Sequence, residues 1–134
     1  MSEVVLFTDG ASRGNPGLAG AGVYITDTGG KKLVEKSLFL GKTTNNVAEY
    51  RALIIGLEEV IKINPSHVTV KMDSELIVKQ LNGEYRVRNP GLLPLYRDAV
   101  ERIEQINGIR VQHIPRNENR EADRLANKAI DERE

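Results

Sequence analysis

The hydrophobic residues of the first forty positions follow strand-like patterns. A continuous apolar run over residues 4–7 predicts a strand buried on both faces, which ends in a sharp turn at Asp9-Gly10. After a glycine-rich segment, residues 19–26 resume a strand-like pattern, and Gly29-Gly30 predicts a hairpin into a third strand over residues 32–40. We therefore expect the chain to begin with a three-stranded antiparallel meander.

From residue 46 onward the hydrophobic positions change to a helical period. Apolar side chains between Tyr50 and Ile61 recur on one face, which predicts a long helix that ends near Asn64-Pro65. The remaining chain predicts a strand over residues 67–72, helices over residues 74–81 and 92–106, a strand over residues 109–114 and a last helix through residues 122–129. This order favours an α/β fold in which helices cover both faces of a mixed sheet.

The composition predicts one soluble, cytoplasmic domain over residues 1–134. The chain contains no cysteine, which excludes a disulfide scaffold, a thiolate zinc site and a cysteine nucleophile and fits a reducing compartment. Glu3 and the short apolar runs argue against a signal peptide and against a membrane span. The 19 basic residues balance the 19 acidic ones, so a nucleic acid would have to be held by a local cluster of basic groups.

Two glycine-containing segments imitate nucleotide-binding loops. The segment over residues 10–17 lacks the G-x-G core, and a strand follows it where a dinucleotide fingerprint requires a helix. Gly41-Lys42-Thr43 matches the end of a Walker A loop, but Lys36 stands where the first glycine is required. Neither segment is therefore interpreted as a nucleotide site.

Four acidic residues lie at the predicted ends of elements. Each has a structural explanation: Asp9 as part of a turn, Glu49 in a capping box with Asn46, Asp73 as the N-cap of the next helix, and Asp123 beside a helix N-terminus. Ligands of open α/β sheets gather at the carboxyl ends of the central strands, where Asp9 and Asp73 are expected. Four carboxylates that converge there would repel one another, raise at least one pKa and bind Mg²⁺ or Mn²⁺ through hard oxygen ligands.

The segments that carry these acids are DGASRGNPG (residues 9–17), TNNVAE (residues 44–49), DS (residues 73–74) and NREAD (residues 119–123). In this order and spacing they resemble ribonuclease H of the HI type. The resemblance implies a five-stranded mixed sheet of order 3-2-1-4-5. It also implies hydrolysis of the RNA strand of an RNA–DNA hybrid, largely independent of sequence, with 5′-phosphate and 3′-hydroxyl products. It points to no obligatory protein partner.

The resemblance also assigns a role to each acid in a site that holds two Mg²⁺ or Mn²⁺ ions. Asp9 would bridge both ions, and Glu49 and Asp73 would hold the ion near the leaving 3′ oxygen. Asp123 would hold the ion that delivers the attacking water. Such a pair of ions supplies both the nucleophile and the stabilisation of the leaving group, so that no covalent nucleophile is required.

The expected substrate contacts are Asn15, Asn45, Asn46, Arg13 and Ser74. The three asparagines match family positions at the minor groove of the hybrid, where an amide can hydrogen-bond to sugar hydroxyls and base edges. Helix capping is the alternative role for Asn45 and Asn46. Two other functions stay open for the chain. One is a DNA nuclease or resolvase of the same fold, and the other is a hybrid-binding module without catalysis.

The chain departs from the family pattern in two places. The connection over residues 83–90 is short and lacks a basic extension, so we expect weaker and more salt-sensitive binding, with backbone contacts from Arg13, Lys42, Arg86 and Arg88. The loop before the last acid, residues 115–118, lacks the histidine that often assists the reaction in this family.

Three residues near that loop are candidates for an accessory role. His113 is predicted within a strand, and we favour a structural role for it. Arg116 is the alternative occupant of the missing histidine's place, where it would supply charge but no proton relay. Asn119 is the third candidate.

Overall fold

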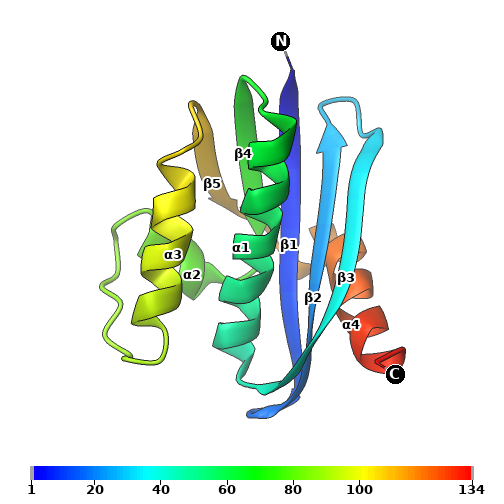
Figure 1. Ribbon diagram of the computed structural model, residues 1–134, viewed down its shortest axis with the longest axis vertical. Coiled ribbons are helices and arrows are strands. Elements are labelled where there is room, and N and C mark those ends of the chain that lie inside the picture. Colours follow the sequence, from blue (N-terminus) through cyan, green and yellow to red (C-terminus); the bar gives the residue numbers. More distant parts are fainter. Residues whose placement is uncertain (1, 134) are drawn as a thin grey trace.

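The computed structural model describes residues 2–133, which form a five-stranded mixed sheet between helices (Figure 1). The elements are β1 (Glu3–Gly14), β2 (Gly17–Asp27), β3 (Lys32–Thr43), α1 (Asn45–Ile63), β4 (His67–Met72), α2 (Glu75–Leu81), α3 (Leu93–Ile103), β5 (Ile109–His113), a short 3₁₀ helix η1 (Arg116–Glu118) and α4 (Arg120–Asp131). The strand order is β3-β2-β1-β4-β5. The first three strands pair antiparallel, and β4 and β5 run parallel to β1. The predicted meander and strand order are confirmed.

Strand β1 differs from its prediction in length. No turn forms at Asp9-Gly10, because pairing with β2 continues to the register pair Gly14↔Gly17. The parallel pairing with β4 ends earlier, at Phe7↔Lys71. Residues 8–14 therefore pair with no strand other than β2, and this half of β1 extends past the end of its parallel neighbour. The turn prediction was wrong, since polar residues here continue a strand.

Helix α1 begins and ends on identifiable signals. The Thr44 hydroxyl accepts from the Val47 amide at 3.3 Å, so Thr44 is the N-cap. At the other end, Asn64 adopts a left-handed conformation with φ of 56°, and its amide donates to the Val60 carbonyl at 2.9 Å. The helix therefore stops at the predicted place. Within residues 2–133 there is no helix of the length and apolar character needed to cross a membrane.

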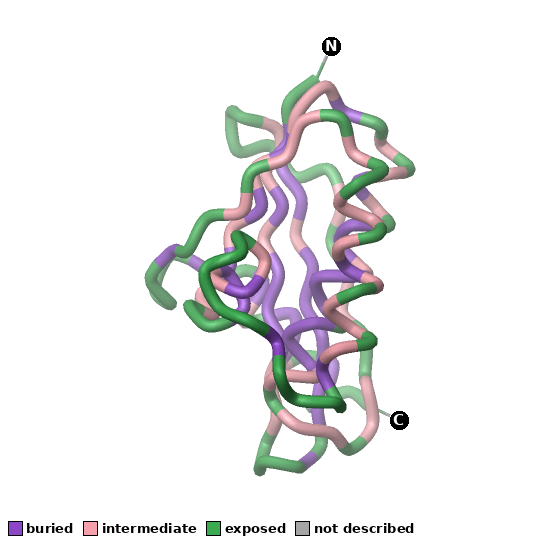
Figure 2. The backbone as a smooth tube through the Cα atoms, turned by 90° about the vertical axis from the view of Figure 1, so that its left-hand side faces the viewer, coloured by how far each residue is buried: buried purple, intermediate pink, exposed green. Residues whose placement is uncertain are grey.

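The main core lies between the sheet and helices α1, α2 and α3, and its buried backbone is visible in Figure 2. One polar pair lies inside it: the Tyr50 hydroxyl donates to Gln80 Oε1 at 2.5 Å. Burial raises the pKa of Tyr50, which keeps this hydroxyl a neutral donor. The fully buried large side chains are Leu6, Ile25, Leu53, Leu57, Met72 and Ile77, among others.

Helix α4 packs on the opposite face of the sheet, against glycines of β2 (Figure 1). A Cβ at Gly22 would lie 2.0 Å from the Ala122 carbonyl oxygen, and one at Gly20 would lie 2.3 Å from the Ala126 carbonyl oxygen. Only glycine permits this approach of helix backbone to strand. The two glycines therefore set how closely α4 and its first turn lie against the sheet.

This packing predicts that Gly22→Ala destabilises the protein. The added methyl group would meet helix backbone, which cannot move as a side chain does, so we expect a loss of about 3 kcal/mol in the free energy of unfolding. Urea denaturation measures the change. The control is Gly29→Ala, where the nearest atom to a new Cβ is a side-chain oxygen at 3.4 Å. Equal stability of the two variants would contradict the packing described here.

Candidate active site

Three carboxylates from different elements converge on one spot. Asp9 comes from β1, Glu49 from α1, and Asp73 directly follows β4. One oxygen of each lies within 4.8 Å of the others. Asp9 and Glu49 are both only 5% exposed. The spot lies where β1 continues past the last residue of β4, so the acids occupy the carboxyl edge of the parallel strands, as predicted, although Asp9 itself is inside a strand.

Glu49 is held at the cluster by the backbone of β1. A Cβ at Gly10 would lie 2.2 Å from the Ala48 carbonyl carbon, so α1 rests directly on the strand at this point. The Gly10 amide donates to Glu49 Oε1 at 3.0 Å. The predicted capping box with Asn46 does not form, because Thr44 caps the helix and Glu49 lies in its second turn.

Asp73 is positioned by a buried amide. The N-cap of α2 is Ser74, whose hydroxyl accepts from the Ile77 amide at 3.4 Å, so Asp73 does not have the capping role considered for it. Asn119, which is 1% exposed, donates through Nδ2 to the Thr8 carbonyl at 3.0 Å and to Asp73 Oδ2 at 3.4 Å. This residue links the strand β1, the end of β4 and the start of α4.

Asp123 lies at the rim of the cluster, in the first turn of α4. Its side chain is 34% exposed, and Arg116 lies on its solvent side with a guanidinium nitrogen 3.8 Å from Oδ1. Asn127, one helical turn later, donates to the same oxygen at 3.3 Å. Asp123 is therefore the fourth acid of the site, and it is more accessible to solvent than Asp9 and Glu49.

Burial and repulsion by neighbouring charges raise the pKa of the two buried carboxyls, Asp9 and Glu49. Burial first, and then the negative charges of Glu49 and Asp73 and the contact with Asp123, raise the pKa of Asp9 to about 9. Burial likewise raises the pKa of Glu49, against the opposing effect of the Gly10 amide. This agrees with the expected raised pKa. Closely spaced hard oxygen ligands that repel one another are a suitable site for a divalent cation, which would relieve the repulsion.

The acids lie in a depression with a volume of about 520 Å³. Within residues 2–133 its lining consists of Asp9, Gly10, Ala11, Ser12, Arg13, Asn45, Glu49, Asp73, Ser74, Arg116, Asp123 and Asn127. All four predicted acids are therefore brought together with the candidates Arg13, Asn45, Ser74 and Arg116.

The predicted asparagine contacts gather in a second depression of about 420 Å³. Asn15, Asn45 and Asn46 line it together with Asn89 from the connection between α2 and α3. The Asn15 side-chain oxygen accepts from the Asn45 amide at 3.0 Å, which ties the β1–β2 turn to the start of α1. Neither Asn45 nor Asn46 caps the helix, since that position belongs to Thr44. Asn45 lines both depressions and so joins them.

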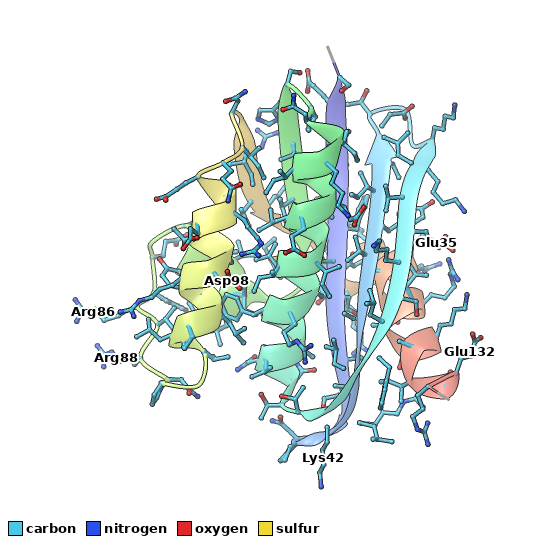
Figure 3. All side chains as sticks on the ribbon, in the orientation of Figure 1. Glu35, Lys42, Arg86, Arg88, Asp98 and Glu132 are labelled. Carbon is cyan, nitrogen blue, oxygen red and sulfur yellow. The ribbon has the colours of Figure 1, made fainter. Side chains whose placement is uncertain are left out.

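Several other candidates lie outside these depressions. His113 ends β5 as an exposed residue opposite Met72 in the parallel register, and its predicted place in a strand is confirmed. Arg86 and Arg88 project outward from the connection between α2 and α3, and Lys42 projects from the lower end of the sheet (Figure 3). None of these three basic side chains is among the residues that line the acidic depression.

Asn127 is a residue of the site that the sequence analysis missed. Its side-chain nitrogen donates a hydrogen bond to Asp123, and its side-chain oxygen accepts one from Arg13. The Arg13 guanidinium is in turn paired with Asp131 at 2.7 Å. The available signal was spacing, because residues four apart on a helix lie on the same face and Asn127 is four residues after Asp123.

Comparison with known proteins gives a consistent family. Residues 7–129 match a family model described as reverse transcriptase-like. Ribonuclease H of Pseudomonas savastanoi pv. phaseolicola is 36% identical over 150 residues, which cover 97% of this chain and 94% of that protein. The bifunctional protein Rv2228c of Mycobacterium tuberculosis is 45% identical over 96% of this chain, but the chain spans only 36% of that protein's length.

The fold has similar solved structures. The structure of LC11-RNase H1 in complex with an RNA/DNA hybrid has a TM-score of 0.93 and 44% sequence identity, covering 97% of this chain and 98% of that one. The five-stranded sheet and the helices on its two faces are therefore shared with a protein whose hybrid complex is known.

The raised pKa of Asp9 predicts how Asp9→Asn changes stability without metal. The folded chain binds this proton more tightly than the unfolded chain, so the stabilisation is complete below about pH 4 and is lost as the pH rises toward about 9. Asparagine cannot ionise. In the presence of a chelator, we expect the variant to melt at the same temperature as the unaltered protein near pH 4 and roughly 3 to 10 °C higher near pH 8.

Thermal unfolding followed by circular dichroism over this pH range measures the effect. Glu101→Gln, an exposed carboxyl on α3, is the control for the removal of one negative charge. A lower melting temperature of Asp9→Asn near pH 8 would mean that Asp9 stabilises the fold as an ionised residue, contrary to the repulsion described above.

Proposed function

The chain belongs to the ribonuclease H family, and from this premise we propose that it hydrolyses the RNA strand of RNA–DNA hybrids with two bound Mg²⁺ or Mn²⁺ ions. The observation that carries the proposal is the convergence of Asp9, Glu49 and Asp73, with Asp123 at the rim, in one depression. The similar protein that holds an RNA/DNA hybrid supports the choice of substrate. Because the mycobacterial relatives are much longer than this chain, the activity of the whole protein is part of the proposal.

The four acids are the residues that would hold the ions. Asp9, in the centre, would be shared by both ions, with Glu49 and Asp73 on one of them and Asp123 on the other. When bound, such ions provide a hydroxide nucleophile near neutral pH and stabilise the leaving oxygen of a phosphodiester. Other residues of the chain orient these carboxylates: the Gly10 amide donates a hydrogen bond to Glu49, and the Asn119 side chain donates one to Asp73. The proposed products are a 5′-phosphate and a 3′-hydroxyl.

The second depression is the proposed site for the minor groove of the hybrid. Asn15, Asn45, Asn46 and Asn89 present amides there, and Asn45 connects this surface to the acids. Amides can both donate to and accept from the ribose 2′-hydroxyl, the group that distinguishes RNA from DNA. Because such contacts do not identify a base sequence, cleavage is proposed to be largely independent of sequence. Arg13 and Ser74, at the acidic depression, are the proposed contacts to the backbone.

A direct assay tests the proposed activity. Labelled RNA–DNA hybrid, duplex DNA and double-stranded RNA are incubated separately with Mg²⁺, with Mn²⁺ and with a chelator. We expect cleavage of the RNA strand of the hybrid in either metal and none with the chelator. Asp9→Asn and Asp73→Asn should each lower the rate about 1,000-fold or more, equivalent to roughly 4 kcal/mol of transition-state stabilisation. Glu101→Gln is the control variant.

Each other outcome of this assay identifies a different function. Cleavage restricted to duplex DNA would identify a DNA nuclease of the same fold. Hybrid binding without cleavage would identify a binding module. The cytoplasmic location, expected from the cysteine-free sequence, stays a prediction that microscopy of the tagged chain would check.

Arg116 is the proposed accessory residue of the reaction, and His113 is proposed to be structural. Arg116 lies 3.8 Å from Asp123, and its charge opposes the rise in the pKa of Glu49 that burial causes, whereas His113 is an exposed residue at the end of β5. We expect Arg116→Ala to lower kcat about 10-fold and His113→Ala to change it less than 2-fold, because one surface cation contributes roughly 1 kcal/mol. Steady-state cleavage kinetics measure both. A loss confined to His113→Ala would reverse the two assignments.

A further inference from the structure

We propose that Asn127 is a positioning residue, whose side-chain amide, held by Arg13, directs the carboxylate of Asp123 toward the ion that this acid would bind. The inference rests on the proposed function and adds to it a residue outside the four acids. It also assigns a purpose to the contact between the end of β1 and the helix α4.

The contacts form a continuous chain across the site. Asn127 donates through Nδ2 to the Asp123 carbonyl at 3.0 Å and to Asp123 Oδ1 at 3.3 Å. On its other side, Asn127 Oδ1 accepts from an Arg13 guanidinium nitrogen at 3.3 Å. Arg13 is itself paired with Asp131 at 2.7 Å. Asn127 therefore lies between a cation and the fourth acid, and lines the depression.

Arg13 decides which way the Asn127 amide faces. An asparagine side chain has an acceptor oxygen and a donor nitrogen, and the two ends can exchange places by rotation. A guanidinium has donors only, so it selects the orientation in which the oxygen faces Arg13 and the N–H groups face Asp123. Arg13 is also paired with Asp131, on the last turn of the same helix, so two residues of α4 contact its guanidinium. The Asn127 nitrogen is thereby oriented toward Asp123 before any ion binds.

Asp123 depends on such a partner more than the other acids. Asp9 and Glu49 are 5% exposed, and Asp73 is held by buried Asn119. The Asp123 side chain is 34% exposed, and its other partner, Arg116, is 82% exposed and lies at 3.8 Å. An arginine this exposed holds a carboxylate weakly. Without Asn127, Asp123 could turn toward Arg116 and solvent, and an ion would have to reorient it.

Two variants of Asn127 and one control test the proposal. Asn127→Leu keeps a similar volume but cannot donate, and Asn127→Ala removes the contact if leucine does not fold. Lys128→Ala changes the adjacent exposed residue of the same helix. Melting temperatures establish that each protein is folded. Isothermal titration of the protein alone with Mn²⁺ then measures ion binding independently of cleavage, and hybrid cleavage is measured over a range of Mn²⁺ concentrations.

Loss of a hydrogen bond to a metal ligand commonly lowers metal affinity or activity 10- to 100-fold. For both Asn127 variants we therefore expect Mn²⁺ affinity to fall about 10-fold and the Mn²⁺ concentration at half-maximal cleavage to rise by a similar factor. The KM for the hybrid should stay within about 2-fold, and high Mn²⁺ should restore much of kcat. Lys128→Ala should match the unaltered protein.

An unchanged Mn²⁺ isotherm in the folded Asn127 variants would overturn the proposal, whatever their activity. If KM rose at the same time, Asn127 would be a hybrid contact. If the unaltered chain failed to cleave the hybrid at all, the proposed function would fail, and the Mn²⁺ titration would still decide whether Asn127 supports ion binding at Asp123.

Discussion

The contact of α1 with β1 at Gly10 is the interaction on which the arrangement of the site depends. It is so close that a single added carbon would lie 2.2 Å from helix backbone. This approach places Glu49 beside Asp9, where burial and then the repulsion between the two negative charges raise the pKa of Asp9. The Gly10 amide compensates one oxygen of Glu49 at 3.0 Å. The fold therefore holds two acids close enough to repel each other, and a divalent cation would relieve this repulsion.

The sheet topology brings the remaining acids to that contact. Because β1 extends beyond the end of β4, Asp73 at the end of β4 comes alongside Asp9. On the other face, the glycines of β2 let α4 approach closely, which brings Asp123 and buried Asn119 to the same place. The site is thus assembled by backbone contacts at glycines and by the hydrogen bonds of the Asn119 side chain. Each of these contacts joins parts of the chain that are far apart in sequence.

The sequence was most informative where the signal was periodic or matched a family motif. The order of elements, the sheet order and the four acids were predicted in this way. The length of β1 was not, because Asp9-Gly10 has the composition of a turn and only pairing with β2 makes it a strand. The role of Glu49 was ambiguous for a similar reason: Asn46 and Glu49 have capping-box spacing, and the distant Gly10 amide determines the partner that Glu49 takes.

Charge balance links ion binding to substrate binding in the proposed function. The chain has no net charge, yet its acidic depression would repel the phosphates of a hybrid. Arg86, Arg88 and Lys42 project outward (Figure 3), and none of them lines the depression to offset its charge. Bound cations would remove the repulsion, so ions and hybrid should each favour binding of the other, and by linkage the coupling free energy is the same in both directions. Under the proposed function, the ions would contribute to substrate recognition as well as to the reaction, and their contribution would be larger because the connection between α2 and α3 is short.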